Sequence, residues 1–219
     1  MNMKIALIFV MVISTINTHS EVGKTHFIVG NPRKAVFPTH QLSRSITPPF
    51  TQKVLSDAAA YFSCDDNIQH HLITLIDQEK EAIFLAVYMF TDEKVAQALC
   101  NARRRGVNIE LITDISCLKD RASKIDILSA NGCIIYIYNP TITSRGTSLM
   151  HHKFALFRNC KNKPRIWTGS YNFTKAAHSI NQEHVIIFSD QLLFHKFIEQ
   201  FEKLKVKTYK YTKGIIRSK

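Results

Sequence analysis

Residues 82–114 read AIFLAVYMFTDEKVAQALCNARRRGVNIELITD, a stretch that predicts a strand, a helix and a second strand in succession. The apolar runs 82–90 and 107–113 have the length of buried strands. Between them Asp92 can cap a helix whose apolar residues recur at helical spacing, and Gly106 can end that helix after three arginines. Two strands joined through a helix of this length run parallel, so the stretch predicts an α/β fold.

The same rhythm extends in both directions from this stretch. Further strands are predicted at 58–63, 133–138, 150–157, 165–168 and 185–189, and further helices at 68–76, 120–130 and 191–205. We therefore expect one mixed, largely parallel β-sheet flanked by helices.

The ends of the chain differ in composition from this central part. Residues 1–20 have a charged start, an apolar run and a polar end, which predicts a signal peptide and a secreted or periplasmic protein. An uncleaved segment that anchors the protein to a membrane is the alternative. Residues 21–57 lack periodicity and contain four prolines, which indicates an extended N-terminal arm. Residues 58–205 are then the main folded domain, and residues 206–219 a basic C-terminal tail.

The charge of the chain is strongly positive. It has 29 lysines and arginines against 17 acidic residues, a formal net charge of +12. A surplus of this size favours a polyanionic partner, either nucleic acid or an anionic lipid surface. Five cysteines show no C-x-x-C pair and no zinc-site spacing, so we interpret them as structural residues and expect no metal site.

The segment MHHKFALF, residues 150–157, contains the first candidate site residues. Side chains alternate between the two faces of a strand, so His151 and Lys153 should point the same way and His152 the opposite way. An imidazole beside an ammonium suits an anionic substrate, with Lys153 binding the charge while His151 acts as nucleophile or acid–base group. Alone, this spacing also fits an ordinary surface histidine.

A second segment, WTGSYNFT at residues 167–174, follows shortly afterwards. Gly169 and Ser170 allow close approach of backbone N–H groups to an anion. Ser170 and Asn172 add a hydroxyl and an amide for phosphoryl oxygens, and Glu183 can orient an imidazole by accepting its Nδ1–H. The segment 169–172 also fits an ordinary turn that precedes a helix.

Together these residues resemble the HKD motif of the phospholipase D superfamily, in particular its single-motif members, the Nuc-type endonucleases and the mitochondrial cardiolipin hydrolase group. The resemblance covers roughly residues 57–205 and implies a phospholipase D-like α-β-α sandwich. It also implies a two-step displacement without a metal ion or other cofactor. In that mechanism His151 forms a phosphohistidine, Lys153, Ser170 and Asn172 stabilise charge, and Glu183 sets the tautomer of His151.

Two features of the motif bear on partners and activity. The family's motif has an acidic residue where this chain has Arg158, which the strand alternation places on the face opposite His151. The family mechanism needs two histidines, and the chain has one motif, so we expect a homodimer with a shared active site on its two-fold axis. The substrate is then nucleic acid, with the protein an endonuclease, or phospholipid, with the protein a phospholipase D. A non-catalytic phosphate-binding relative is a third hypothesis, suggested by Arg158.

Overall fold

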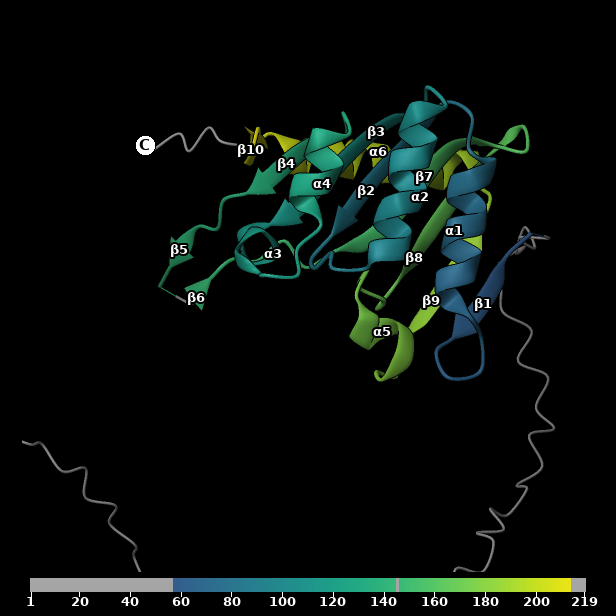
Figure 1. Cartoon of the computed structure of the whole chain (residues 1–219), viewed down its shortest axis with the longest axis horizontal. Coiled ribbons are helices and arrows are strands. Elements are labelled where there is room, and N and C mark those ends of the chain that lie inside the picture. Colours follow the sequence, from purple (N-terminus) through teal and green to yellow (C-terminus); the bar gives the residue numbers. More distant parts are fainter. Residues whose placement is uncertain (1–56, 145, 214–219) are drawn as a thin grey trace, which may run out of the picture. The chain divides into compact units, whose positions relative to one another are not determined.

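The computed structural model describes residues 57–144 and 146–213 (Figure 1). The predicted signal peptide and, except for Asp57, the predicted arm lie outside these residues. The centre of the fold is an eight-stranded sheet in the order β1-β9-β8-β7-β2-β3-β4-β10, and β5 and β6 form a separate small hairpin. The strands are β1 (Ala59–Phe62), β2 (Ala82–Val87), β3 (Asn108–Asp114), β4 (Ile134–Tyr138), β5 (Ile142–Thr143), β6 (Gly146–Thr147), β7 (Lys153–Cys160), β8 (Lys163–Gly169), β9 (His184–Phe188) and β10 (Thr208–Tyr211).

The α/β class and the mixed sheet are confirmed, but parallel pairing is less extensive than predicted. Among the strands of the described residues, only β2, β3 and β4 run parallel to one another, and the other neighbouring strands are antiparallel. The physical reason lies partly in a tight turn between β7 and β8. Lys161 and Asn162 both adopt positive φ there, which allows the chain to reverse directly into an antiparallel hairpin.

Helices cover both faces of the sheet, as Figure 1 shows with α1 and α2 in front and α6 behind. One face carries α1 (Ile68–Gln78), α2 (Glu93–Arg104), α3 (Ile115–Lys119) and α4 (Ile125–Ala130), the other carries α6 (Gln191–Lys205), and α5 (Lys175–Ser179) follows β8. The Asp92 side chain caps α2 by accepting from the Val95 N–H at 3.1 Å, as predicted. The predicted helix 120–130 is shorter, because the Asp120 side chain binds the Ala122 N–H and stabilises a turn there.

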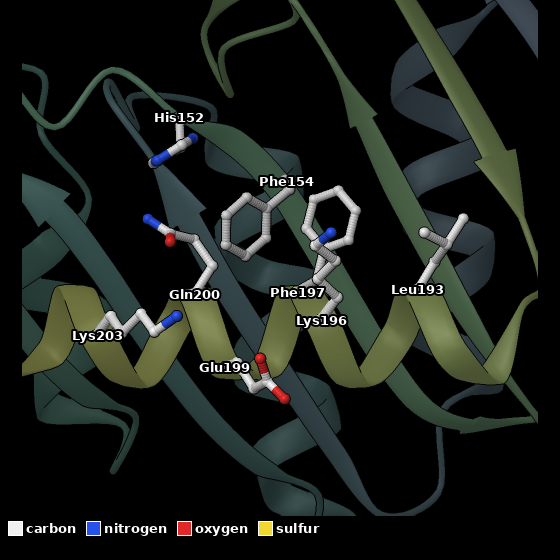
Figure 2. Close-up of a pocket in the computed structure, with 8 residues that line it drawn as sticks. All are labelled: His152, Phe154, Leu193, Lys196, Phe197, Glu199, Gln200 and Lys203. Atoms are coloured by element: carbon white, nitrogen blue, oxygen red, sulfur yellow. The ribbon is translucent and has the colours of Figure 1, made fainter.

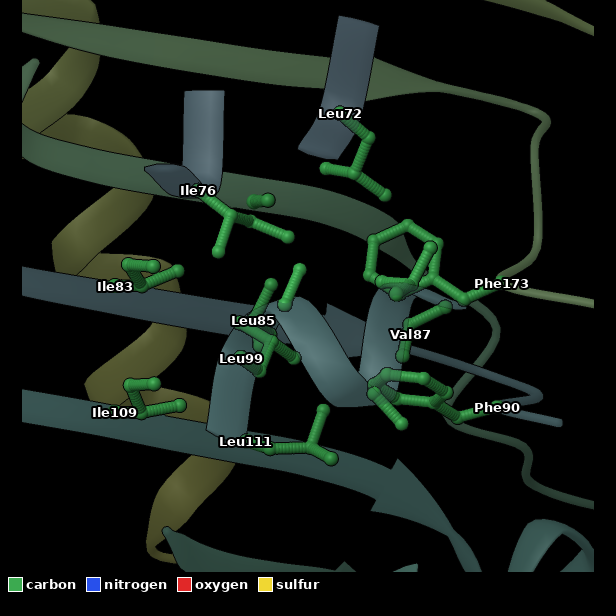
Figure 3. Close-up of a cluster of buried hydrophobic side chains, with 14 of the residues drawn as sticks. Leu72, Ile76, Ile83, Leu85, Val87, Phe90, Leu99, Ile109, Leu111 and Phe173 are labelled. Atoms are coloured by element: carbon green, nitrogen blue, oxygen red, sulfur yellow. The ribbon is translucent and has the colours of Figure 1, made fainter. Parts of the chain in front are cut away.

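Two hydrophobic cores hold these layers together. The larger lies between the sheet and α1 and α2, and Figure 3 shows Leu72, Leu85, Leu99 and Phe173 meeting within it. The smaller lies under α6 and includes Phe201. All six residues of β2 are buried, because helices cover this strand on both faces, and it therefore anchors the centre of the sheet.

The sheet extends beyond the predicted end of the domain at residue 205. Residues 208–211, which were assigned to the basic tail, form β10 and pair with β4 in antiparallel register. Lys210 is exposed between Tyr209 and Tyr211, and Tyr211 packs against the larger core, so the strand can pack while its charge remains in water. All five cysteines are unpaired, with Cys64 exposed and the others buried. Within residues 57–144 and 146–213, no helix combines the length and apolar character needed to cross a bilayer.

Candidate active site

The predicted site residues gather at one edge of the sheet. Strand β2 ends there, and β7, which runs antiparallel to it, begins there. His151 lies two residues before the start of β7, Gly169 ends β8 and residues 170–172 follow it, and Glu183 immediately precedes β9. Antiparallel neighbours thus bring together residues that are more than thirty positions apart in the chain.

His151 and Lys153 both contact Tyr88, which follows β2. The rings of His151 and Tyr88 are 4.8 Å apart, and the Lys153 Nζ lies 5.4 Å from the centre of the Tyr88 ring. Lys153 Nζ also donates a hydrogen bond to the His151 carbonyl at 2.7 Å. The His152 ring instead lies beside Phe154, 5.6 Å away, which belongs to the core under α6. The predicted separation of the two histidines onto opposite faces is confirmed.

The environment of Lys153 differs from that of His151. His151 is exposed, whereas Lys153 is buried. Burial lowers the pKa of Lys153 below its usual 10.5, and the negative charge of Glu183 opposes this shift. A buried ammonium interacts strongly with an anion that enters the site, so Lys153 is suited to hold a phosphoryl group beside an accessible imidazole.

The lowered pKa of Lys153 predicts a pH dependence. As pH rises through this pKa the ammonium loses its proton, so kcat/KM for the chromogenic diester bis(p-nitrophenyl) phosphate should fall at a pH below 10.5. In Lys153→Arg the side chain keeps its charge, so this alkaline limb should disappear even though the rate is lower. A limb that persists unchanged in Lys153→Arg would assign the titration to another group.

The turn after β8 is fixed by contacts with two neighbouring segments. The Asn172 side-chain oxygen accepts from the Met89 N–H at 3.2 Å, so its NH₂ is the end that can serve a phosphoryl oxygen. The Ser170 N–H donates to the His184 carbonyl at 3.1 Å, and the Ser170 hydroxyl donates to Glu183. The predicted anion nest is therefore wrong for the Ser170 N–H, because pairing with β9 already uses it.

Gly169 serves the packing of β8 against β9. A Cβ at this position would lie 2.1 Å from the His184 carbonyl oxygen, which is far inside van der Waals contact. The close approach that was predicted for a phosphate is thus made by the protein's own backbone. Gly169 positions Ser170 and Asn172 and is not itself placed to contact a substrate.

Glu183 belongs to a small polar network. Its carboxylate accepts from the Ser170 hydroxyl and from the Asn181 side-chain amide, the latter at 3.2 Å, and its N–H donates to Ser63 Oγ at 2.7 Å. Among the residues that the structure describes, the contacts of this carboxylate are therefore with Ser170 and Asn181 and not with His151. Within one chain, Glu183 orders Ser170 and adds negative potential near Lys153.

Two supporting residues were missed by the sequence reasoning. Tyr88 forms the wall shared by His151 and Lys153, and Asp114 is a fully buried carboxylate at the end of β3. Asp114 accepts from the Met150 N–H at 3.0 Å and so fixes the backbone just before His151. The available signal was a carboxylate close behind the apolar pair Leu111 and Ile112 at the end of a predicted strand.

Arg158 lies where the strand alternation placed it. It is exposed, and its guanidinium packs over the Phe84 ring, 5.4 Å from the ring centre, in the core under α6. Arg158 therefore faces away from His151 and Lys153. Its side chain packs on the face under α6 and not at the edge that carries the site.

The mixed sheet, together with His151, Lys153 and Asn172 at one edge, defines a phospholipase D-like α/β domain. Residues 72–205, more than half of the chain, match the family described as cardiolipin synthase, PLD-like domain. The chain belongs to this family of the phospholipase D superfamily.

Individual relatives agree with this membership. The chain is 32% identical over 126 residues to a phospholipase D of Rickettsia conorii, a match that covers 58% of each protein. It is 27% identical to a mitochondrial cardiolipin hydrolase of Xenopus tropicalis, over 64% of this chain and 61% of the relative. Nuc of Salmonella typhimurium, a solved phospholipase D family member, superposes with a TM-score of 0.62 at 25% identity, covering 70% of this chain and 97% of Nuc. Homology within this superfamily supports a phosphodiester hydrolase.

Proposed function

We propose that this protein is a metal-independent phosphodiesterase that works through a phosphohistidine at His151, with nucleic acid as its substrate. The observation that carries the proposal is the pairing of an exposed imidazole with the buried Lys153 ammonium around Tyr88. An accessible nucleophile next to a fixed positive charge is what an attack on an anionic phosphodiester requires.

The proposed reaction has two displacements at phosphorus. The His151 imidazole attacks, a nitrogen–phosphorus bond forms, and the bond from phosphorus to the leaving oxygen breaks while a second histidine protonates that oxygen. Water then attacks phosphorus and gives a proton to the second histidine, and the nitrogen–phosphorus bond breaks. Lys153 and Asn172 stabilise the charge on the phosphoryl oxygens, and Ser170 and Glu183 keep the turn in place.

The second histidine comes from another copy of the chain in this proposal, because His152 faces the opposite side of the sheet. Large apolar side chains are exposed near the same edge as His151, which is typical of a surface that another protein covers. Their exposed fractions are 55% for Phe62, 52% for Leu149 and 74% for Ile180. A two-fold axis near this edge would bring both copies of His151 to one site.

A charged residue at Ile180 should weaken such a dimer. Ile180→Asp places a carboxylate in the proposed interface, so sedimentation should show a monomer at concentrations where the parent chain is a dimer. Activity should fall by at least about tenfold in parallel, since each site loses its second histidine. Leu192→Asp, an exposed position on α6, is the control and should remain dimeric. A parent chain that is monomeric and fully active would contradict the shared site.

The charge of the chain favours nucleic acid as the substrate. A formal net charge of +12 attracts a polyphosphate backbone, and the fold matches Nuc over most of that protein. Phospholipid is the second candidate, because relatives of the chain are named phospholipase D and mitochondrial cardiolipin hydrolase. Both substrates contain the same phosphodiester bond, so they share one chemistry at His151.

A cleavage panel distinguishes these substrates and tests the role of metals. Plasmid, single-stranded oligonucleotide, phosphatidylcholine and cardiolipin are each incubated with excess EDTA. We expect oligonucleotide or plasmid cleavage to keep its full rate, because His151 and Lys153 need no metal ion to attack phosphorus. Loss of activity on chelation would contradict the mechanism. If only the lipids are hydrolysed, the proposed mechanism stands but the substrate is phospholipid and not nucleic acid.

A further inference from the structure

A groove lies on the face of the sheet opposite the candidate active site, between α6 and the start of β7. Its volume is about 330 Å³, and Figure 2 shows that α6 forms one long wall. The lining residues of the helix span positions 193–203, which is about 15 Å at 1.5 Å per residue. The groove is thus elongated along α6. It is lined by His152, Phe154, Leu193, Lys196, Phe197, Glu199, Gln200 and Lys203.

The groove changes in polarity along its length. Figure 2 places His152, Gln200 and Lys203 toward one end, and Leu193 toward the other, beyond Phe197. Phe154 forms the floor and packs edge-on against Phe197, with ring centres 5.2 Å apart. One end of the groove therefore has two polar side chains and an ammonium, and the rest is aromatic and aliphatic. This arrangement matches a molecule with a charged head and a hydrocarbon tail.

The charges at the polar end favour an anionic head. Lys203 is exposed there with its ammonium free to reach a ligand. Burial and the charges of Lys153 and His151 lower the pKa of His152 below 6.5, so its ring is neutral near pH 7 and offers an N–H donor. Lys196 and Glu199 also line the groove, one positive and one negative, so together they add no net charge. The net positive charge at the rim is therefore that of Lys203.

Other occupants fit less well. A nucleobase is flat and compact and would leave most of a channel about 15 Å long unfilled. A helix of another protein is about 10 Å across with its side chains, so even one turn of it has a larger volume than the about 330 Å³ of the groove. We propose that the α6 groove binds a single hydrocarbon chain with an anionic head, such as a fatty acid or a lysophospholipid. The head lies by Lys203 and His152, and the tail runs over Phe154 and Phe197 to Leu193.

This inference does not rest on the proposed catalytic function, because the groove and His151 lie on different faces of the sheet. The test is isothermal titration of the full chain at pH 8 with a series of saturated fatty acids, each below its micelle concentration. Each added methylene should strengthen binding about fourfold while the groove is being filled, and then the affinity should level off. An affinity independent of chain length would overturn the proposal.

Two pairs of variants localise the binding. Leu193→Asp should weaken binding of dodecanoate about tenfold, whereas the neighbouring exposed Leu192→Asp should not. Lys203→Glu should weaken it about fivefold, and Lys207→Glu, exposed just beyond α6, is the matched control. Circular dichroism confirms that each variant is folded. Equal losses in test and control variants would contradict the site.

A competition experiment separates the alternatives. Thymidine monophosphate or a short oligonucleotide should not displace dodecanoate from the groove, and lauroyl lysophosphatidic acid should. Displacement by the nucleotides would contradict the proposal and would show that the groove binds a nucleobase. Hydrolysis of bis(p-nitrophenyl) phosphate, measured on the same preparations, reports on His151 separately, so failure of one assignment leaves the other open to its own test.

Discussion

Replacing His151 by asparagine should lower kcat for phosphodiester hydrolysis by at least about a thousandfold, because the variant has no group that can form the covalent intermediate. The side chain is exposed and of similar size, so the fold should be unaffected. The rate is measured with bis(p-nitrophenyl) phosphate and with the preferred natural substrate. His152→Asn tests the assignment of faces and should change kcat by less than about tenfold, since its ring lies beside Phe154.

The same pair of variants decides between the competing hypotheses. Full activity in His151→Asn would remove this residue from the mechanism. A larger loss in His152→Asn than in His151→Asn would mean that the catalytic face has been assigned wrongly. Absence of hydrolysis in the parent chain, with phosphate or nucleic acid still bound, would favour the non-catalytic hypothesis that Arg158 first suggested.

Gly169→Ala should be among the most destabilising single substitutions in the domain. The new Cβ would lie 2.1 Å from the His184 carbonyl oxygen and 2.8 Å from the Val185 Cα, and both atoms belong to the backbone of β9. Neither can move without breaking strand pairing, so we expect a loss of about 3 kcal/mol or more in the free energy of unfolding. For a domain of this size that corresponds to a decrease in Tm of about 10 °C.

A second glycine provides the control for this measurement. Gly106 has φ of 94°, but a Cβ there would meet nothing within 4 Å. Alanine at Gly106 should therefore cost only about 1 kcal/mol, through backbone strain alone. Thermal unfolding should rank the parent chain first, Gly106→Ala second and Gly169→Ala last. A Gly169→Ala variant as stable as the parent would show that β8 and β9 are not packed this closely.

Local patterns in the sequence predicted much of the fold. The apolar run that became β2, the Asp92 cap of α2 and the exact limits of α6 were readable because each depends on neighbouring residues. The direction of the strands was harder to predict from the sequence, because it depends on which strands become neighbours in the sheet. The tight turn at residues 161–162 made β7 and β8 antiparallel. β10 joined the sheet although the basic segment around it resembles a solvated tail.

In the candidate site, too, local features could be predicted from the sequence and long-range contacts could not. The spacing of His151 and Lys153 on one strand face could be predicted, since alternation is a local property of extended chain. The contacts of Glu183 with Ser170, and of Asp114 with Met150, join segments far apart in the sequence and needed the folded structure. Gly169 shows the limit most clearly, because the sequence predicts a close backbone approach without showing which partner makes it.

The central claim, a covalent intermediate on His151, is tested most directly by trapping it. The protein is mixed with its labelled substrate, quenched within milliseconds under alkaline denaturing conditions that preserve phosphohistidine, and digested for mass spectrometry. The account predicts one labelled peptide, with the substrate phosphoryl group attached to His151, and no such adduct in His151→Asn. Rapid turnover without an adduct, or an adduct on a different residue, would contradict it.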